Sequence, residues 1–162
     1  MHFAPTDDER LVLQGVAKVA RLLRATAARR DTDGNVDAAT LLALRSLGAF
    51  GLLAPESAGG LAADASTWTL ALTELATADA GLALLVAEHG VALRLWAQAA
   101  GDDAALASLA AGLRLACLPL RGPGSHLDDA TVAAAATEGA EGSLLSGRTA
   151  WTPLAARATD AI

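Results

Sequence analysis

Two short segments place polar residues where they could act chemically. Gly122-Pro123-Gly124-Ser125 carries backbone N–H groups that could cradle a phosphate, although the same residues also suit a plain turn. Glu88 and His89 are adjacent titratable residues, which invites a catalytic interpretation. His89, however, falls on an apolar stripe at helical spacing, and this position favours a packed histidine.

Two further sets of residues are weaker candidates for chemistry. His126, Asp128 and Asp129 could hold a metal, but three ligands on one loop without a fourth favour ordinary loop residues. Cys117 is the single cysteine, so no internal disulfide can form. Its apolar surroundings, LRLACLPL, favour a buried, inert thiol over a nucleophile. These residue types alone therefore identify no catalytic residue.

Composition limits the class of protein. The 162 residues are 53% hydrophobic and 19% charged, so the chain can bury a core. The net charge of -6 argues against a nucleic-acid partner, which needs clustered basic residues. The one basic cluster is predicted to be a solvated helix face, and it comprises Arg21, Arg24, Arg29 and Arg30.

The chain also lacks the usual signs of a membrane or export segment. Its N-terminus has no basic region ahead of an apolar stretch, so we predict no signal peptide. The longest apolar run, Ala80–Ala87, is much shorter than a bilayer span. We therefore expect a cytoplasmic protein without a membrane partner.

Apolar periodicity and capping residues predict five helices up to about residue 112. They run from a cap at Thr6 to about Arg30, from Asp37 to Leu47, and from caps at Ser66, Asp79 and Asp102, the last ending at Gly112. The fourth helix should bury one stripe of side chains, namely Leu82, Leu85, His89, Leu93 and Trp96.

Short apolar runs separated by Gly and Pro follow, and they predict strands. We expect strands at 130–137 and 143–151, a turn at 138–142, and the beginning of another strand at 159–162. The sequence thus predicts an α+β chain, with a helical domain at 1–112 and part of a β domain at 113–162.

Five segments, in order, resemble the acyl-CoA dehydrogenase family. The most informative is LGAFGLLAPESAGGL at Leu47–Leu61, which is similar to that family's Pro-Glu and Gly-Gly signature. The others are HFAPTDDERLVLQGVAKVA, LALTELATADAGLALLVAEHGVAL, GDDAALASLAAGLRLACLPL and SLLSGRTAWTPLAARATDAI. Together they cover nearly the whole chain.

The resemblance implies a fold and an activity. The fold would be an N-terminal all-α helical bundle followed by an incomplete β-barrel-like segment. The activity would be that of an FAD-dependent oxidoreductase, which removes hydrogen from the α and β carbons of an acyl-CoA thioester, as in fatty acid metabolism. In that family a carboxylate base takes the α proton, and the hydride moves to the flavin.

The resemblance also implies which residues contact the flavin. Leu120, Arg121 and Trp151 match the positions at the ring end of the family's site. Gly124 and Ser125 match the contact to phosphate or ligand.

Two positions in these segments depart from the family pattern. Arg121 stands where the family has Thr, and Pro153 stands where it has the Thr of its Trp-Ile-Thr motif. An alignment shifted by one residue would let Thr152 serve instead. The alternative to the enzyme is a non-catalytic relative, a scaffold or partner subunit that has lost flavin binding.

The family's catalytic base and its adenine-end FAD contacts come from a C-terminal helical domain. We therefore expect the base beyond Ile162 and no catalytic residue within this chain. We also expect either a homo-oligomer or a partner chain that supplies this domain. On this expectation the chain alone is inactive.

Overall fold

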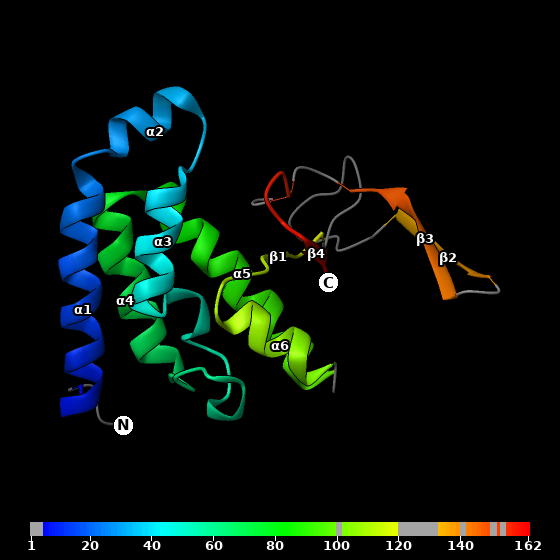
Figure 1. The fold of residues 1–162 in the computed structure, drawn as a ribbon, viewed down its shortest axis with the longest axis horizontal. Coiled ribbons are helices and arrows are strands. Elements are labelled where there is room, and N and C mark those ends of the chain that lie inside the picture. Colours follow the sequence, from blue (N-terminus) through cyan, green and yellow to red (C-terminus); the bar gives the residue numbers. More distant parts are fainter. Residues whose placement is uncertain (1–4, 100–101, 120–132, 140–141, 150–151, 153–154) are drawn as a thin grey trace.

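The computed structural model describes residues 5–99, 102–119, 133–139, 142–149, 152 and 155–162. Within these ranges, six α-helices precede four strands (Figure 1). The helices are α1 (Asp7–Arg24), α2 (Ala27–Asp33), α3 (Ala38–Leu47), α4 (Ala65–Ala78), α5 (Ala80–Gln98) and α6 (Asp103–Ala110), and two 3-10 turns span Ala49–Gly51 and Glu56–Ala58. The helical region followed by a few strands confirms the α+β class, and the described strands close no barrel.

Side-chain caps explain where most helices begin. Thr6 forms a capping box with Glu9, and the carboxylates of Asp37, Asp79 and Asp102 accept N–H bonds from the first turns of their helices. These caps were predicted correctly. The cap of α4 was not, because Asp64 and not Ser66 accepts the Thr67 N–H, at 2.7 Å.

The first helix ends earlier than the sequence predicted. It stops at Arg24, and α2 starts again at Ala27 after a break at Thr26, whose φ of -115° and ψ of 6° are not helical. The Thr26 hydroxyl donates to the Leu23 carbonyl oxygen, which competes with regular helical hydrogen bonding. The single predicted helix is therefore two helices.

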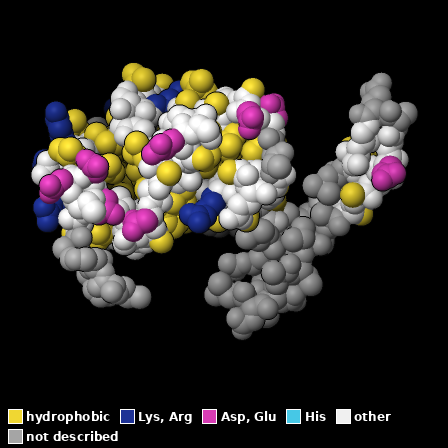
Figure 2. All heavy atoms as spheres, turned by 90° about the horizontal axis from the view of Figure 1, so that it is seen from below, with side chains coloured by type: hydrophobic (Ala, Val, Ile, Leu, Met, Phe, Trp, Pro, Cys, Tyr) yellow, Lys and Arg dark blue, Asp and Glu magenta, His cyan; other side chains and the backbone are white. Residues whose placement is uncertain are grey.

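The core lies around α5, which contacts α4, α6 and β1. Four of the five side chains in the predicted stripe are buried, and the fifth, Trp96, is partly buried. Apolar side chains also lie among charged ones at the surface of the helical body (Figure 2). Leu11, Leu22 and Leu42 are such residues, spread singly along α1 and α3 as on many soluble surfaces.

Among the described residues, α5 is the helix long and apolar enough to cross a membrane by length and composition, with a mean hydropathy of 1.3. That test is also passed by core helices of soluble proteins. Here α5 buries Leu82, Val86, His89 and Leu93 against the other elements. Burial of these side chains therefore explains the apolar composition of α5.

The strands form two separate pairs. β1 (Ala116–Cys117) pairs in parallel with β4 (Asp160–Ala161). β2 (Ala133–Gly139) and β3 (Gly142–Arg148) form an antiparallel hairpin that projects from the helical body (Figure 1). The predicted turn at 138–142 was too long, since pairing continues to Gly139 opposite Gly142. The division into domains at 1–112 and 113–162 stays a prediction.

The glycine-rich loop between α3 and α4 folds back on itself. Gly59 adopts a left-handed φ of 77°, which glycine tolerates best. A Cβ added at Gly60 would lie 2.2 Å from the carbonyl oxygen of Ala54. The Ala62 N–H also donates to that same oxygen, at 2.8 Å. The backbone at Gly60 thus lies directly against the backbone at Ala54, and no side chain fits between them.

Gly60→Ala should therefore destabilise the protein by about 3 kcal/mol or more, because the backbone of the loop must move to admit a methyl group. Gly34→Ala is the matched control, since Gly34 has a left-handed φ of 61° but no atom within 4 Å of an added Cβ. We expect that variant to lose about 1 kcal/mol. Urea denaturation measures both, and equal losses would contradict the close contact at Gly60.

Candidate functional site

A cavity of about 400 Å³ lies in the β segment, between β1 and the residues leading into β4. Ligand pockets in proteins have volumes of roughly 300–1,000 Å³, so this cavity is large enough to be one. Its walls are formed by Cys117, Pro119, Thr149, Thr152, Ala155, Ala158, Thr159, Asp160 and Ala161. This cavity is the candidate site.

The structure describes one of the predicted flavin residues, Thr152, and places it in the cavity wall. The Oγ1 atoms of Thr149 and Thr152 lie 3.4 Å apart, so two neutral hydroxyls stand together there. The other predicted contacts lie outside the described residues: Leu120, Arg121, Gly124, Ser125 and Trp151. The predicted phosphate turn at 122–125, the loop at 126–129 and Pro153 lie outside them as well.

The first wall of the cavity, β1, is held along both of its edges. On one edge the carbonyl oxygens of Leu115 and Cys117 accept N–H groups from the segment around β4. On the other edge no strand is paired with β1 among the described residues. There the Ala116 N–H donates to His89 Nδ1 at 3.1 Å, and the Leu118 N–H donates to a Glu88 carboxylate oxygen at 3.0 Å.

His89 is buried, which confirms the prediction of a packed histidine, and its hydrogen bonds indicate a neutral ring. Its Nε2 lies 3.0 Å from the Leu109 carbonyl oxygen, which can only accept. The proton is therefore on Nε2, and Nδ1 is free to accept from Ala116. Burial lowers the pKa of His89 from 6.5 to about 4, although the Leu109 hydrogen bond and the charge of Asp160 oppose this shift. His89 thus bridges α6 and β1 from α5.

The opposite wall carries an ion pair. Arg114 donates two hydrogen bonds to the carboxylate of Asp160, which also accepts from the Thr159 hydroxyl. Burial would raise the pKa of Asp160, but the bonds from Arg114 and Thr159 outweigh it and hold the pKa below its ordinary value. The cavity wall therefore holds a carboxylate whose charge is balanced.

Cys117 is buried, as predicted, and it also lies in the cavity wall. Burial, followed by the negative charge of Glu88, raises the pKa of its thiol. A raised pKa disfavours the thiolate and hence nucleophilic chemistry. Within the described part of the chain, no group of three metal-ligating side chains comes together either.

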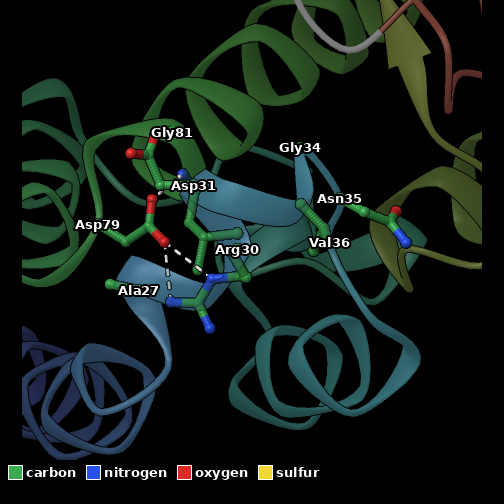
Figure 3. Close-up of a pocket in the computed structure, with 9 residues that line it drawn as sticks. Ala27, Arg30, Asp31, Gly34, Asn35, Val36, Asp79 and Gly81 are labelled. Carbon is green, nitrogen blue, oxygen red and sulfur yellow. Dashed lines mark hydrogen bonds and ion pairs between the residues drawn. The ribbon is translucent and has the colours of Figure 1, made fainter.

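A second cavity, of about 260 Å³, lies beside the buried ion pair of Arg30 and Asp79 (Figure 3). Nε and one terminal nitrogen of Arg30 each lie 2.8 Å from the same Asp79 oxygen. The other bonds of the guanidinium go to the Leu23 carbonyl oxygen and to the hydroxyls of Thr26 and Thr40. Because its donors are used within the fold, Arg30 is a structural residue.

The prediction that Arg30 belongs to a solvated face is wrong. Only 6% of the residue is exposed, because its partner Asp79, 49 positions away, draws it inward between α2 and the start of α5. No local pattern in the sequence shows such a pairing. The Glu88 contact with β1 was missed for the same reason.

Arg30→Met should cost about 3–5 kcal/mol of stability, because it leaves the Asp79 carboxylate buried without its partner. Adding Asp79→Asn should recover part of this loss, since Asn is neutral and still caps α5. Arg29→Met removes two solvent-accessible ion pairs, to Asp33 and Asp37, and should cost less than about 1 kcal/mol. Chemical denaturation of the three proteins measures these differences, and no recovery in the double variant would contradict the buried pair.

Stability should also depend on pH through His89. The folded pKa of about 4 lies below the unfolded value of 6.5, so the unfolded chain binds the proton more readily. Stability from His89 is complete above pH 6.5 and falls as the pH drops toward 4, by about 3 kcal/mol.

The measurement is the free energy of unfolding at pH 7 and at pH 4.5, for the wild type and for His89→Gln. Carboxylates that titrate in both proteins cancel in the difference. We expect the variant to be less stable at pH 7 and to show a shallower pH dependence. Parallel pH profiles would show that His89 does not titrate on unfolding.

Comparison with known proteins connects this geometry to a family. The chain is similar to butyryl-CoA dehydrogenase from Megasphaera elsdenii, at 26% identity and a TM-score of 0.85 over 98% of this chain and 44% of that one. A glutaryl-CoA dehydrogenase from Mycobacterium smegmatis in complex with FADH2 has a similar fold, at 21% identity and a TM-score of 0.84, over 97% of this chain and 42% of that one. Nitrososynthase from Micromonospora carbonacea var. africana is 28% identical, with a TM-score of 0.74 over 96% of this chain and 41% of that one.

The chain thus spans less than half the length of these solved structures. A comparison with curated proteins finds no match. The family model described as acyl-CoA dehydrogenase, N-terminal domain, matches residues 6–113, which include all six helices and the glycine-rich loop. This chain belongs to the acyl-CoA dehydrogenase family.

Proposed function

We propose that this chain is part of an acyl-CoA dehydrogenase-like flavoprotein that removes hydrogen from the α and β carbons of an acyl-CoA thioester. The observation that carries the proposal is the cavity of about 400 Å³ with Thr152 in its wall. It lies in the segment where the sequence resemblance puts the flavin. The dehydrogenases of similar fold, one of them in complex with FADH2, support the same cofactor.

The described residues of the cavity wall have chemical types that suit the ring end of a flavin. The hydroxyls of Thr149 and Thr152 can donate to or accept from a ring oxygen or nitrogen. Asp160 is neutralised by Arg114, so it does not repel an anionic cofactor. Pro119 and Ala158 add an apolar surface suited to a flat aromatic ring.

FAD, when bound, supplies the acceptor for a hydride from the substrate. The part of the chain described here contributes binding and orientation. None of its carboxylates lines the cavity without a partner: Asp160, the one acidic residue in the wall, is engaged by Arg114. We therefore assign the base that takes the α proton to none of the described residues.

We expect residues 1–162 alone to bind FAD weakly and to reduce no dye in the presence of an acyl-CoA. Thr152→Val should weaken FAD binding by about three- to tenfold, since it removes one hydroxyl from the cavity wall. Thr77→Val, on the exposed side of α4, is the control and should bind FAD as the wild type does.

The measurements are titration with FAD, followed through flavin fluorescence, and an acyl-CoA-dependent dye-reduction assay. Turnover by residues 1–162 would show that the base lies within them. Equal FAD affinity of the wild type and Thr152→Val would show that the flavin does not bind at this cavity wall.

The second candidate is a relative that keeps the fold without this reaction. It is favoured by the replacement of two family threonines, by Arg121 and Pro153. The similarity to a protein named nitrososynthase also shows that this fold occurs with another activity. A purified protein that shows no flavin absorbance and takes up no FAD would support this candidate.

A further inference from the structure

We propose that Glu88 is a positioning residue for the cavity in the β segment, acting through the backbone of β1. Its carboxylate accepts the N–H of Leu118 at 3.0 Å. Leu118 lies between Cys117 and Pro119, and both of these neighbours line the cavity. A bond to Leu118 therefore fixes the wall that they form.

The position of Glu88 in its helix supports this role. α5 has 19 residues, and its charged side chains are those of Glu88 and Arg94. Arg94 is exposed, whereas Glu88 is half-buried and faces β1. A half-buried carboxylate must find hydrogen-bond donors to offset its desolvation. The Leu118 N–H is such a donor.

The edge of β1 that faces α5 explains why the bond matters. Backbone N–H groups that point away from β4 need another acceptor when they are buried. His89 supplies one for Ala116, and Glu88 supplies the next one along the same edge, for Leu118. Among the residues that the structure describes, two adjacent residues of α5 thus stand where a neighbouring strand would pair. A bond to a charged acceptor is stronger than a neutral one, so Glu88 holds the end of β1 that leads into the cavity.

The importance of this wall for a ligand rests on the proposed flavin function. The position of the wall itself can be measured without any ligand. Cys117 is the single cysteine, it is buried, and it lies in the wall directly before Leu118. Its rate of labelling by a thiol reagent therefore reports how firmly β1 is held.

The experiment compares Glu88→Met, Glu88→Gln and the wild type. Both variants remove the negative charge beside Cys117, but Gln keeps an oxygen that can accept the Leu118 N–H. The difference between the two variants thus isolates the hydrogen bond from the charge. Glu74→Met is the matched control, because Glu74 is a half-buried glutamate on α4.

We expect Cys117 in Glu88→Met to be labelled about tenfold faster than in Glu88→Gln, and Glu74→Met to behave as the wild type. The Leu118 amide should exchange its hydrogen faster by a similar factor, while the Leu75 amide in the α4 core keeps its rate. Equal labelling of the two Glu88 variants would overturn the proposal. Equal acceleration at Leu118 and Leu75 would also overturn it, since that would show a general loss of stability.

Adding FAD separates this proposal from the proposed function. If the cavity holds the flavin, FAD should slow the labelling of Cys117 in the wild type and less so in Glu88→Met. Absence of protection in the wild type would count against the flavin site. The ratio of labelling rates between the two Glu88 variants still decides the role of Glu88 in that case.

Discussion

A short strand at the edge of a helical body must satisfy its backbone on two sides, and β1 meets this requirement with two different kinds of partner. Its β4 side has ordinary strand pairing. Its other side has the side chains of Glu88 and His89. Because both residues come from α5, the angle and register of that helix determine where the β segment begins. The helices therefore position one wall of the candidate site.

The start of α5 is fixed by the same carboxylate that receives Arg30. One oxygen of Asp79 caps the helix at Leu82, and the other pairs with the guanidinium. The ion pair links α2 to α5. The Arg30 guanidinium also donates to Leu23, at the end of α1, and to Thr40, at the start of α3. Buried pairs contribute little net stability, but they penalise alternative arrangements that would leave one charge alone. Here the pair favours a single placement of four helices.

Local signals in the sequence predicted most of the helical part. Capping carboxylates such as Asp37 and Asp102 act on the next few residues, so their effect can be recognised without knowledge of the fold. The break at Thr26 was missed because it depends on a competing hydroxyl bond. The contacts of Arg30 and Glu88 were missed because their partners are distant in sequence. Of the predicted flavin residues, Thr152 lies in the cavity wall. The sequence admitted it only through an alignment to the family motif shifted by one residue, and its contact with a flavin stays a prediction.

The contact between Gly60 and Ala54 changes what the family signature means. Gly60 is required because two stretches of backbone touch, whereas Gly59 is favoured by its left-handed φ, and neither glycine lines the cavity. A match to the family signature at this loop therefore indicates a backbone contact within the fold. Solved structures of similar fold include proteins named butyryl-CoA dehydrogenase and nitrososynthase. The most recognisable stretch of this sequence therefore reports how the chain folds, and it does not by itself identify the reaction.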